Sequence, residues 1–245
     1  RTRRFMYNKK WSFYRFARVR KGANLLKKRI WLCLLLAAVL FCATALADDA
    51  GVLTETELGA WLNKLLLSTA NVAPMNAPVG EESLTQDGYA FLYDSVTLYY
   101  NKPTLDAQSK LNAVSVTDEG LDMPRGVRLG APADMLLAAY GWQNPTLAGD
   151  DSFAPLYALN QLPTAAYWAL AQRSGEQLQS VQCAIHARAG EDRYTDTGVL
   201  YSLQSGVVSA IKVYGLNAYV TKAQVQSNLT SVGAAPADAS PQAVV

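Results

Sequence analysis

Histidine and cysteine are scarce in this sequence: its 245 residues include one histidine, His186, and three cysteines. Zinc sites usually take several histidine or cysteine ligands, and beyond residue 47 the chain has only His186 and Cys183. A single cysteine in that part also excludes an internal disulfide there. The sequence has neither the Gly-Lys-Ser/Thr end of a phosphate-binding loop nor a Gly-x-Ser-x-Gly nucleophile elbow. We therefore predict no metal, no cofactor and no recognisable catalytic motif.

Acidic residues are missing from residues 1–29, which hold twelve of the 22 lysines and arginines. Residues 30–245 consequently have ten basic residues against 20 acidic ones, a net charge of −10, although the whole chain sums to +2. The isoelectric point of 8.4 therefore reflects the head of the chain and not its body. Nucleic acid is not expected as a partner of such an acidic body.

Charge of either sign is missing from residues 30–47, an apolar run that ends in Ala45-Leu46-Ala47 and is followed by Asp48-Asp49. A basic flank (1–29), an apolar run and small residues before an acidic start are typical of a secretory signal cleaved after Ala47. The run is also just long enough for an uncleaved signal-anchor helix, with the basic flank in the cytoplasm. Both interpretations place residues 48–245 outside the cytoplasm, either secreted or anchored to the membrane.

The first part of the body has the patterns of a helix and a hairpin. Thr54 and Glu57 have the spacing of a capping box, and an apolar stripe at helical spacing runs on to Thr69. Residues 70–88 are rich in Asn, Ala, Pro and Gly, which predicts a loop. Residues 89–100 have the composition of a strand, and the alternation in 111–116 predicts its return strand.

The second part is organised around residues 124–141. A turn through Gly126 and Gly130 leads to Pro132, which suits a first helical position, and Gly141 can close the helix in a left-handed conformation. Residues 142–165 predict an irregular, partly acidic segment. Strands are then expected at 166–171 and 178–187, followed by a hairpin of 198–203 with 207–214 around Gln204-Ser205-Gly206. The small residues of 233–245 predict a disordered tail.

A weak repeat relates these two parts. Residues 93–100 with 111–116 resemble residues 194–201 with 208–213. The predicted fold class is α+β: two helix-plus-antiparallel-hairpin units, 48–122 and an enlarged 123–232, with helices layered on an antiparallel sheet and a hydrophobic helix before them.

The same region carries a resemblance. Gly126-Val127-Arg128-Leu129-Gly130, with Tyr140-Gly141 after the helix, resembles a Gly-Ile-x-x-Gly-Asp-Ser…Tyr-Gly signature of exported bacterial proteins of unknown function. That signature is similar to small outer-membrane assembly lipoproteins and to the β-lactamase-inhibitor-protein-like fold. The resemblance implies helices on an antiparallel sheet and a binding role, and it transfers no catalytic residue. Ala131-Pro132 departs from the signature, where Asp-Ser is usual, so the helix start lacks that cap.

Candidate catalytic and ligand groups are few. Strand alternation places Cys183 and His186 on opposite faces, which argues against a Cys-His pair and favours a surface or partly covered histidine. Neither Asp150-Asp151 nor Glu191-Asp192 with Asp196 has the spacing of a calcium loop. Ten aromatic residues are candidates for either a binding face or the core: Tyr89, Tyr93, Tyr99, Tyr100, Tyr157, Tyr167, Trp168, Tyr201, Tyr214 and Tyr219.

These patterns predict a non-enzymatic, extracytoplasmic binding or assembly module of a bacterial cell envelope, with its partner, an unidentified protein or envelope ligand, on the open face of the sheet. The alternative is a cell-wall or glycan hydrolase that uses two carboxylates, one of them in an apolar setting. No residue is singled out as catalytic, cofactor-binding or metal-binding.

Overall fold

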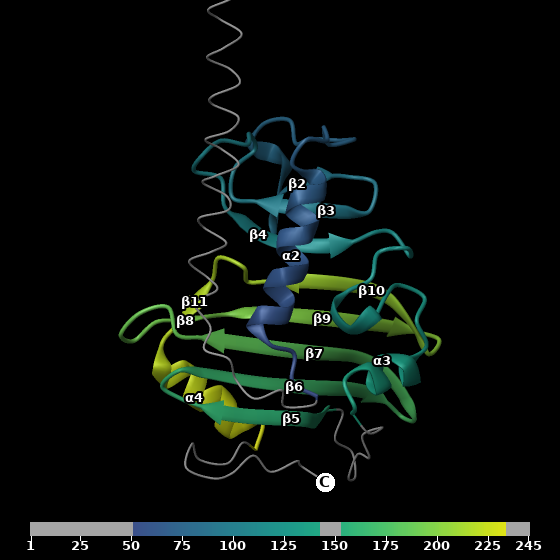
Figure 1. Cartoon of the computed structure of the whole chain (residues 1–245), viewed down its shortest axis with the longest axis vertical. Helices are drawn as coiled ribbons and strands as arrows, with labels where there is room; N and C mark the ends of the chain where they lie inside the picture. The colour runs from purple at the N-terminus through teal and green to yellow at the C-terminus, as the bar shows by residue number, and fades with distance from the viewer. Residues whose placement is uncertain (1–50, 143–152, 234–245) are drawn as a thin grey trace, which may run out of the picture.

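The computed structural model describes residues 51–142 and 153–233 (Figure 1). The predicted basic region (1–29), the apolar run (30–47) and the tail beyond Gly233 lie outside the described residues. Across the two described ranges, no helix has both the length and the apolar character needed to cross a membrane.

One antiparallel sheet of nine strands dominates the fold, in the order β1-β2-β3-β4-β10-β9-β7-β6-β5. Its strands are β1 (Leu84–Thr85), β2 (Gly88–Leu92), β3 (Val96–Tyr100), β4 (Leu111–Val116), β5 (Phe153–Gln161), β6 (Ala165–Ser174), β7 (Gln177–Ala187), β9 (Thr197–Gln204) and β10 (Val207–Tyr214). A two-stranded sheet pairs β8 (Tyr194–Thr195) with β11 (Tyr219–Val220). The helices are α2 (Glu55–Thr69), α3 (Ala133–Ala139) and α4 (Lys222–Ser231), with 3-10 turns η1 (Glu81–Ser83) and η2 (Pro124–Gly126).

The predicted fold class of two helix-plus-hairpin units is wrong. The strands of both predicted units form a single sheet, because β4 of the first pairs with β10 of the second. Strands also extend into residues that were expected to be irregular, since β5 occupies 153–161 and β6 begins at Ala165. Pro155 obscured β5 in the sequence, and proline is tolerated there because β5 is an edge strand.

The two hairpins that meet at the centre of the sheet have the same register. In β3–β4, Tyr99 pairs with Ala113 and Tyr100 with Leu111, so Asn112 is bulged out. In β9–β10, Ser202 pairs with Ala210 and Leu203 with Val208, which leaves Ser209 in the equivalent position. Ser115 pairs with Lys212 where the two hairpins join. The hairpins are therefore related by a local twofold axis through the Ser115–Lys212 pair. Under this axis β3 corresponds to residues of β9 two positions further along the chain than the predicted repeat of 93–100 with 194–201 aligned them.

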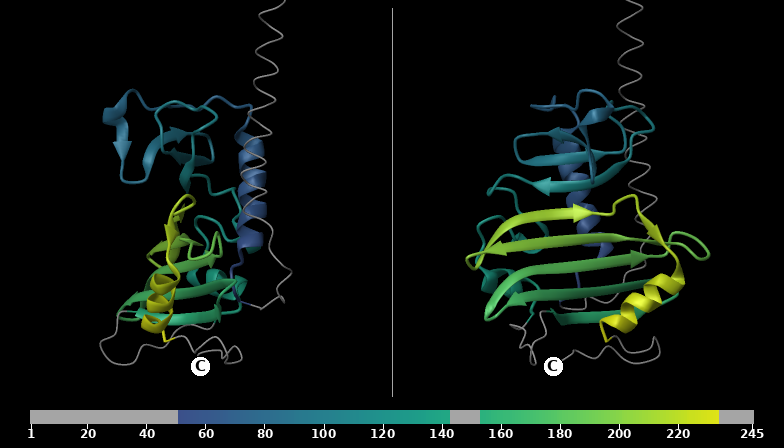
Figure 2. Two further views of the ribbon diagram at one scale, coloured as in Figure 1. Left: turned by 90° about the vertical axis from the view of Figure 1, so that its left-hand side faces the viewer. Right: turned by 180° about the vertical axis from the view of Figure 1, so that it is seen from behind.

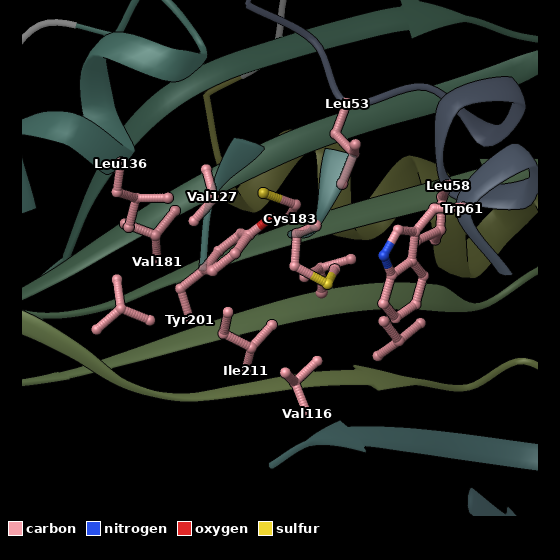
Figure 3. Packing of buried hydrophobic residues seen from close by; sticks show 14 of the residues in the cluster. Leu53, Leu58, Trp61, Val116, Val127, Leu136, Val181, Cys183, Tyr201 and Ile211 are labelled. Carbon is pink, nitrogen blue, oxygen red and sulfur yellow. The ribbon is translucent and has the colours of Figure 1, made fainter. Parts of the chain in front are cut away.

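Helices lie on both faces of the sheet. Helix α2 crosses the strands on the face toward the viewer in Figure 1, with α3 beside it, and α4 lies on the opposite face near β5 and β6 (Figures 1 and 2). The main core fills the α2 side, where Leu58 and Trp61 of α2 meet Val116, Cys183 and other strand residues (Figure 3). A second, smaller core lies under α4.

The predicted helix at 54–69 is confirmed as α2, including the capping box of Thr54 and Glu57. The segment predicted as one strand, 89–100, is instead the β2–β3 hairpin, which turns at Tyr93–Ser95. Pro132 is the N-cap of α3 and not its first residue, and no side chain caps this helix. Gly141 has the left-handed φ of +68° that was expected of it.

Arg125 fastens the start of the described chain to the sheet. Its φ of +65° is unusual for a residue other than glycine. The guanidinium forms an ion pair with Glu57 (2.8 Å from Nε to Oε1), donates to the Val52 carbonyl and lies over the Tyr140 ring. Tyr140 in turn shares a 2.7 Å hydrogen bond with the buried hydroxyl of Tyr201. This constellation links α2, η2, α3 and β9, and we assign it a structural role.

Candidate functional site

The face of the sheet opposite α2 is only partly covered by the described residues. Alternation sends Val181, Cys183 and Ile185 of β7 into the main core, so Gln182 and Ala184 point to the other face. Helix α4 covers one corner of that face, where Val225 and Leu229 and others pack on Ala166, Trp168 and Ala184. Between α4 and the β1–β2 turn, no described helix lies over the strands (Figure 2).

We call this uncovered region the open face. Strand register places on it half-exposed or exposed side chains that include Tyr99, Ser115, Ser180, Gln182, Leu200, Ser202, Lys212 and Tyr214. Most of these side chains end in a hydroxyl, an amide or an ammonium group. Such groups suit hydrogen-bonded recognition of a partner.

Tyr214 lies flat across the neighbouring strand of the open face. A Cβ on Gly198 would overlap the Tyr214 ring, so only glycine permits this position. The ring spans β9 and its hydroxyl accepts a 2.6 Å hydrogen bond from Nε2 of Gln182 on β7. Burial raises the pKa of the Tyr214 phenol to about 12, which keeps it neutral and able to donate at neutral pH.

An ion pair closes the other end of the open face. Lys212 Nζ lies 2.6 Å from Asp87 Oδ2, which joins β10 to the β1–β2 turn across two intervening strands. The Asp87 carbonyl also accepts a hydrogen bond from the Asn112 side chain. Gly88 has a φ of +124°, and a Cβ there would overlap the Tyr100 carbonyl, so glycine lets the turn approach β3. The side chains of Lys212, Gln182 and Tyr214 are therefore held in place before any partner arrives.

The aromatic residues divide between core and surface. Tyr89, Tyr93, Tyr167, Trp168 and Tyr201 are buried, which confirms the core interpretation for them. Tyr99 and Tyr214 lie on the open face, and the exposed Tyr219 lies under the guanidinium of Arg193. Of the candidate aromatic residues, Tyr99 and Tyr214 are therefore the two on the open face, whereas the five buried ones fill the cores.

His186 is buried, with 1 % of its surface exposed, so the expectation of a surface or partly covered histidine is wrong. It stacks on Trp168, and its Nδ1 donates a 2.8 Å hydrogen bond to the Thr195 carbonyl. Asp196 Oδ1 lies 3.6 Å from the same nitrogen, and burial lowers the pKa of the ring. Nε2 has no hydrogen-bond partner among the described residues. The prediction that Cys183 and His186 lie on opposite faces of β7 is confirmed. Within the described ranges, no hydroxyl or thiol group hydrogen-bonds to the His186 ring.

Cys183 is buried in the main core, and burial raises the pKa of its thiol to about 12. A thiol with so high a pKa is protonated at neutral pH and is a poor nucleophile. Its place in the packing is shown in Figure 3. We assign it a packing role.

Three carboxylates of the described residues line two separate hollows. Asp134 and Glu176 line one hollow of about 430 Å³ between α3 and the tips of the β6–β7 and β9–β10 hairpins, but both side chains are exposed. Glu55 lies in a separate, largely apolar hollow beneath α2, and burial raises its pKa to about 7. The acid in an apolar setting therefore lies in a different hollow from Asp134 and Glu176.

Metal ligation finds no support in the described ranges, where no three His, Cys, Asp or Glu side chains gather around a point. In the candidate calcium segment, Asp192 accepts a hydrogen bond from the Lys222 backbone at the start of α4, and Asp196 lies beside His186. Asp150-Asp151 lies outside the described residues.

Sequence reasoning missed the contact between Gly198 and Tyr214, although a signal for it was present. The hairpin around residues 204–206 was predicted, and pairing outward from its turn brings these two residues almost opposite one another. Regular pairing from the turn would place Gly198 opposite Val213, and the bulge at Ser209 shifts its partner by one residue to Tyr214.

Comparison with known proteins found no matching family model, no similar curated protein and no similar solved structure. The resemblance of residues 126–141 to an exported-protein signature therefore stays a prediction.

Proposed function

We propose that this protein is a non-enzymatic binding or assembly module of a bacterial cell envelope, located outside the cytoplasm, and that its partner docks on the open face. The observation that carries the proposal is the prearranged polar surface on β7, β9 and β10. There Tyr214 is fixed by Gly198 and Gln182, Lys212 is fixed by Asp87, and no described helix covers the strands.

Prearranged side chains favour binding because their rotamer freedom is already lost before the partner arrives. Tyrosine adds a large, rigid contact area together with a hydroxyl, a combination common at interfaces. The net charge of −10 on residues 30–245 favours partners that are neutral or basic over anionic ones. The export signal predicted for residues 1–47 supports placing this surface outside the cytoplasm, with residues 30–47 as the membrane attachment if they are retained.

The proposal is tested by capture from envelope extracts with two matched variants. Ser202→Arg places a long cation in the middle of the open face, whereas Ser227→Arg places the same side chain on the exposed side of α4. We expect Ser202→Arg to lose the captured partner and Ser227→Arg to retain it. Equal capture by both variants, with unchanged thermal unfolding, would exclude the open face as the binding surface.

A further inference from the structure

The two edges of the nine-stranded sheet differ in length. At one edge, β1 has two residues, so it offers little backbone for pairing. At the other edge, β5 has nine residues, and no described strand pairs with its outer side. An edge strand exposes a row of unpaired N–H and C=O groups that can pair with another strand. Only the β5 edge is long enough here for such an addition.

Strand β5 has few of the features that normally guard an edge. Its sequence, Phe-Ala-Pro-Leu-Tyr-Ala-Leu-Asn-Gln, contains no charged residue. Pro155 and a bulge between Pro155 and Tyr157 interrupt its first half, and both features discourage pairing there. The stretch Tyr157–Gln161 pairs regularly with β6 and contains neither a proline nor a bulge. These five residues are therefore the part of the edge that is open to pairing.

We propose that Tyr157–Gln161 is a self-association site, at which a second copy of this chain adds its own β5 antiparallel to the first. Antiparallel pairing centred on Leu159 places Tyr157 opposite Gln161 of the other copy, and Ala158 opposite Asn160. It leaves Pro155 and the bulge outside the paired stretch. The absence of charge makes the strand complementary to itself, because no like charges meet across the twofold. The result is one continuous sheet across both copies.

A second copy fits this edge better than an unrelated extended peptide. Recognition of a peptide strand depends on pockets for its alternate side chains. The hollow at the hairpin tips and the hollow beneath α2 both lie elsewhere, and β5 lines neither. An uncharged strand that pairs with a copy of itself needs no such pockets. Because the contact is short, we expect a weak dimer and not an obligate one.

The test compares two variants that differ only in the charge at position 158. Ala158→Lys with Asn160→Lys places two lysine pairs directly opposite each other across the twofold. Ala158→Glu with Asn160→Lys places two Glu–Lys pairs there instead. Like charges opposite each other destabilise strand pairing and opposite charges stabilise it, so we expect the dissociation constants to differ roughly tenfold or more. Sedimentation of the full-length protein from about 10 µM to about 1 mM covers the range of weak contacts.

We expect the unsubstituted protein to dimerise in that range, the Glu/Lys variant to dimerise at least as well, and the Lys/Lys variant to stay monomeric. Backbone hydrogen exchange should slow in β5 and not in β1 as concentration rises. A protein that stays monomeric throughout, or two variants that dimerise equally, would overturn the proposal. Thermal unfolding of both variants checks that each is folded. Ser202→Arg should leave dimerisation unchanged, so this outcome is separate from that of the proposed binding function.

Discussion

Gly198 and Tyr214 should be strongly coupled in stability, and the sign of one substitution should depend on the other. In the unsubstituted protein, Gly198→Ala forces the Tyr214 ring off β9 and breaks its hydrogen bond with Gln182. The lost bond contributes about 0.5–1.5 kcal/mol, and overpacking adds about 1–3 kcal/mol. Replacing a strand glycine with alanine returns about 0.5–1 kcal/mol. The middle values of these ranges give a net loss of about 2 kcal/mol.

In a Tyr214→Ala background the same substitution meets empty space. Gly198 has no positive φ, so alanine fits the strand without backbone strain. Gly198→Ala should then stabilise the protein by about 0.5–1 kcal/mol, which gives a coupling energy of about 2.5–3 kcal/mol. Denaturant unfolding of the four proteins measures this cycle. Additive effects, or a stabilising Gly198→Ala in the unsubstituted protein, would refute the contact and with it the prearrangement of the open face.

Three further predictions concern stability. Burial lowers the pKa of His186 below its usual 6.5, so the unfolded chain binds this proton more readily than the folded protein. Stability should therefore fall as pH drops below about 6.5. His186→Asn can still donate to the Thr195 carbonyl and should flatten this pH dependence, measured by urea unfolding. Burial raises the pKa of Glu55 from 4.5 to about 7, so stability should instead fall as pH rises between these values, and Glu55→Gln should remove that slope in the same assay. Gly215→Ala should lower the melting temperature more than Gly206→Ala does. Both glycines have positive φ, so alanine costs about 1–2 kcal/mol at either position from the left-handed conformation alone, but only a Cβ at 215 would also overlap the Asp196 carbonyl. Equal shifts in melting temperature would contradict this close approach of Gly215 to Asp196.

The parts of the fold that sequence predicted are those in which local signals agree. The capping box and apolar stripe of α2, and the turn residues of the β9–β10 hairpin, each specify an element without help from distant residues. Helix α4 was missed because its polar sequence has only a sparse apolar pattern, and its buried side is defined by contact with Trp168 and Ala184. Its start does carry a capping-box pattern in Thr221 and Gln224, which would have located it.

The arrangement of the strands could not be read from local patterns. That β4 pairs with β10 depends on two segments almost a hundred residues apart, and a single sequence contains no direct record of such pairing. The division into two units followed from the repeat, which relates two hairpins with β9 displaced by two residues and does not show that they share a sheet. The burial of His186 was likewise invisible, because it results from the packing of Trp168 and the β8–β11 sheet around it.

Site-specific photo-cross-linking in intact cells tests most directly whether the open face binds a partner. A photoreactive aromatic residue at position 200, on the open face, is compared with the same residue at position 60, on the exposed side of α2. We expect a discrete cross-linked partner from position 200 and none from position 60. Cross-links from position 60 alone, or the same products from both positions, would contradict the claim that the open face binds the partner.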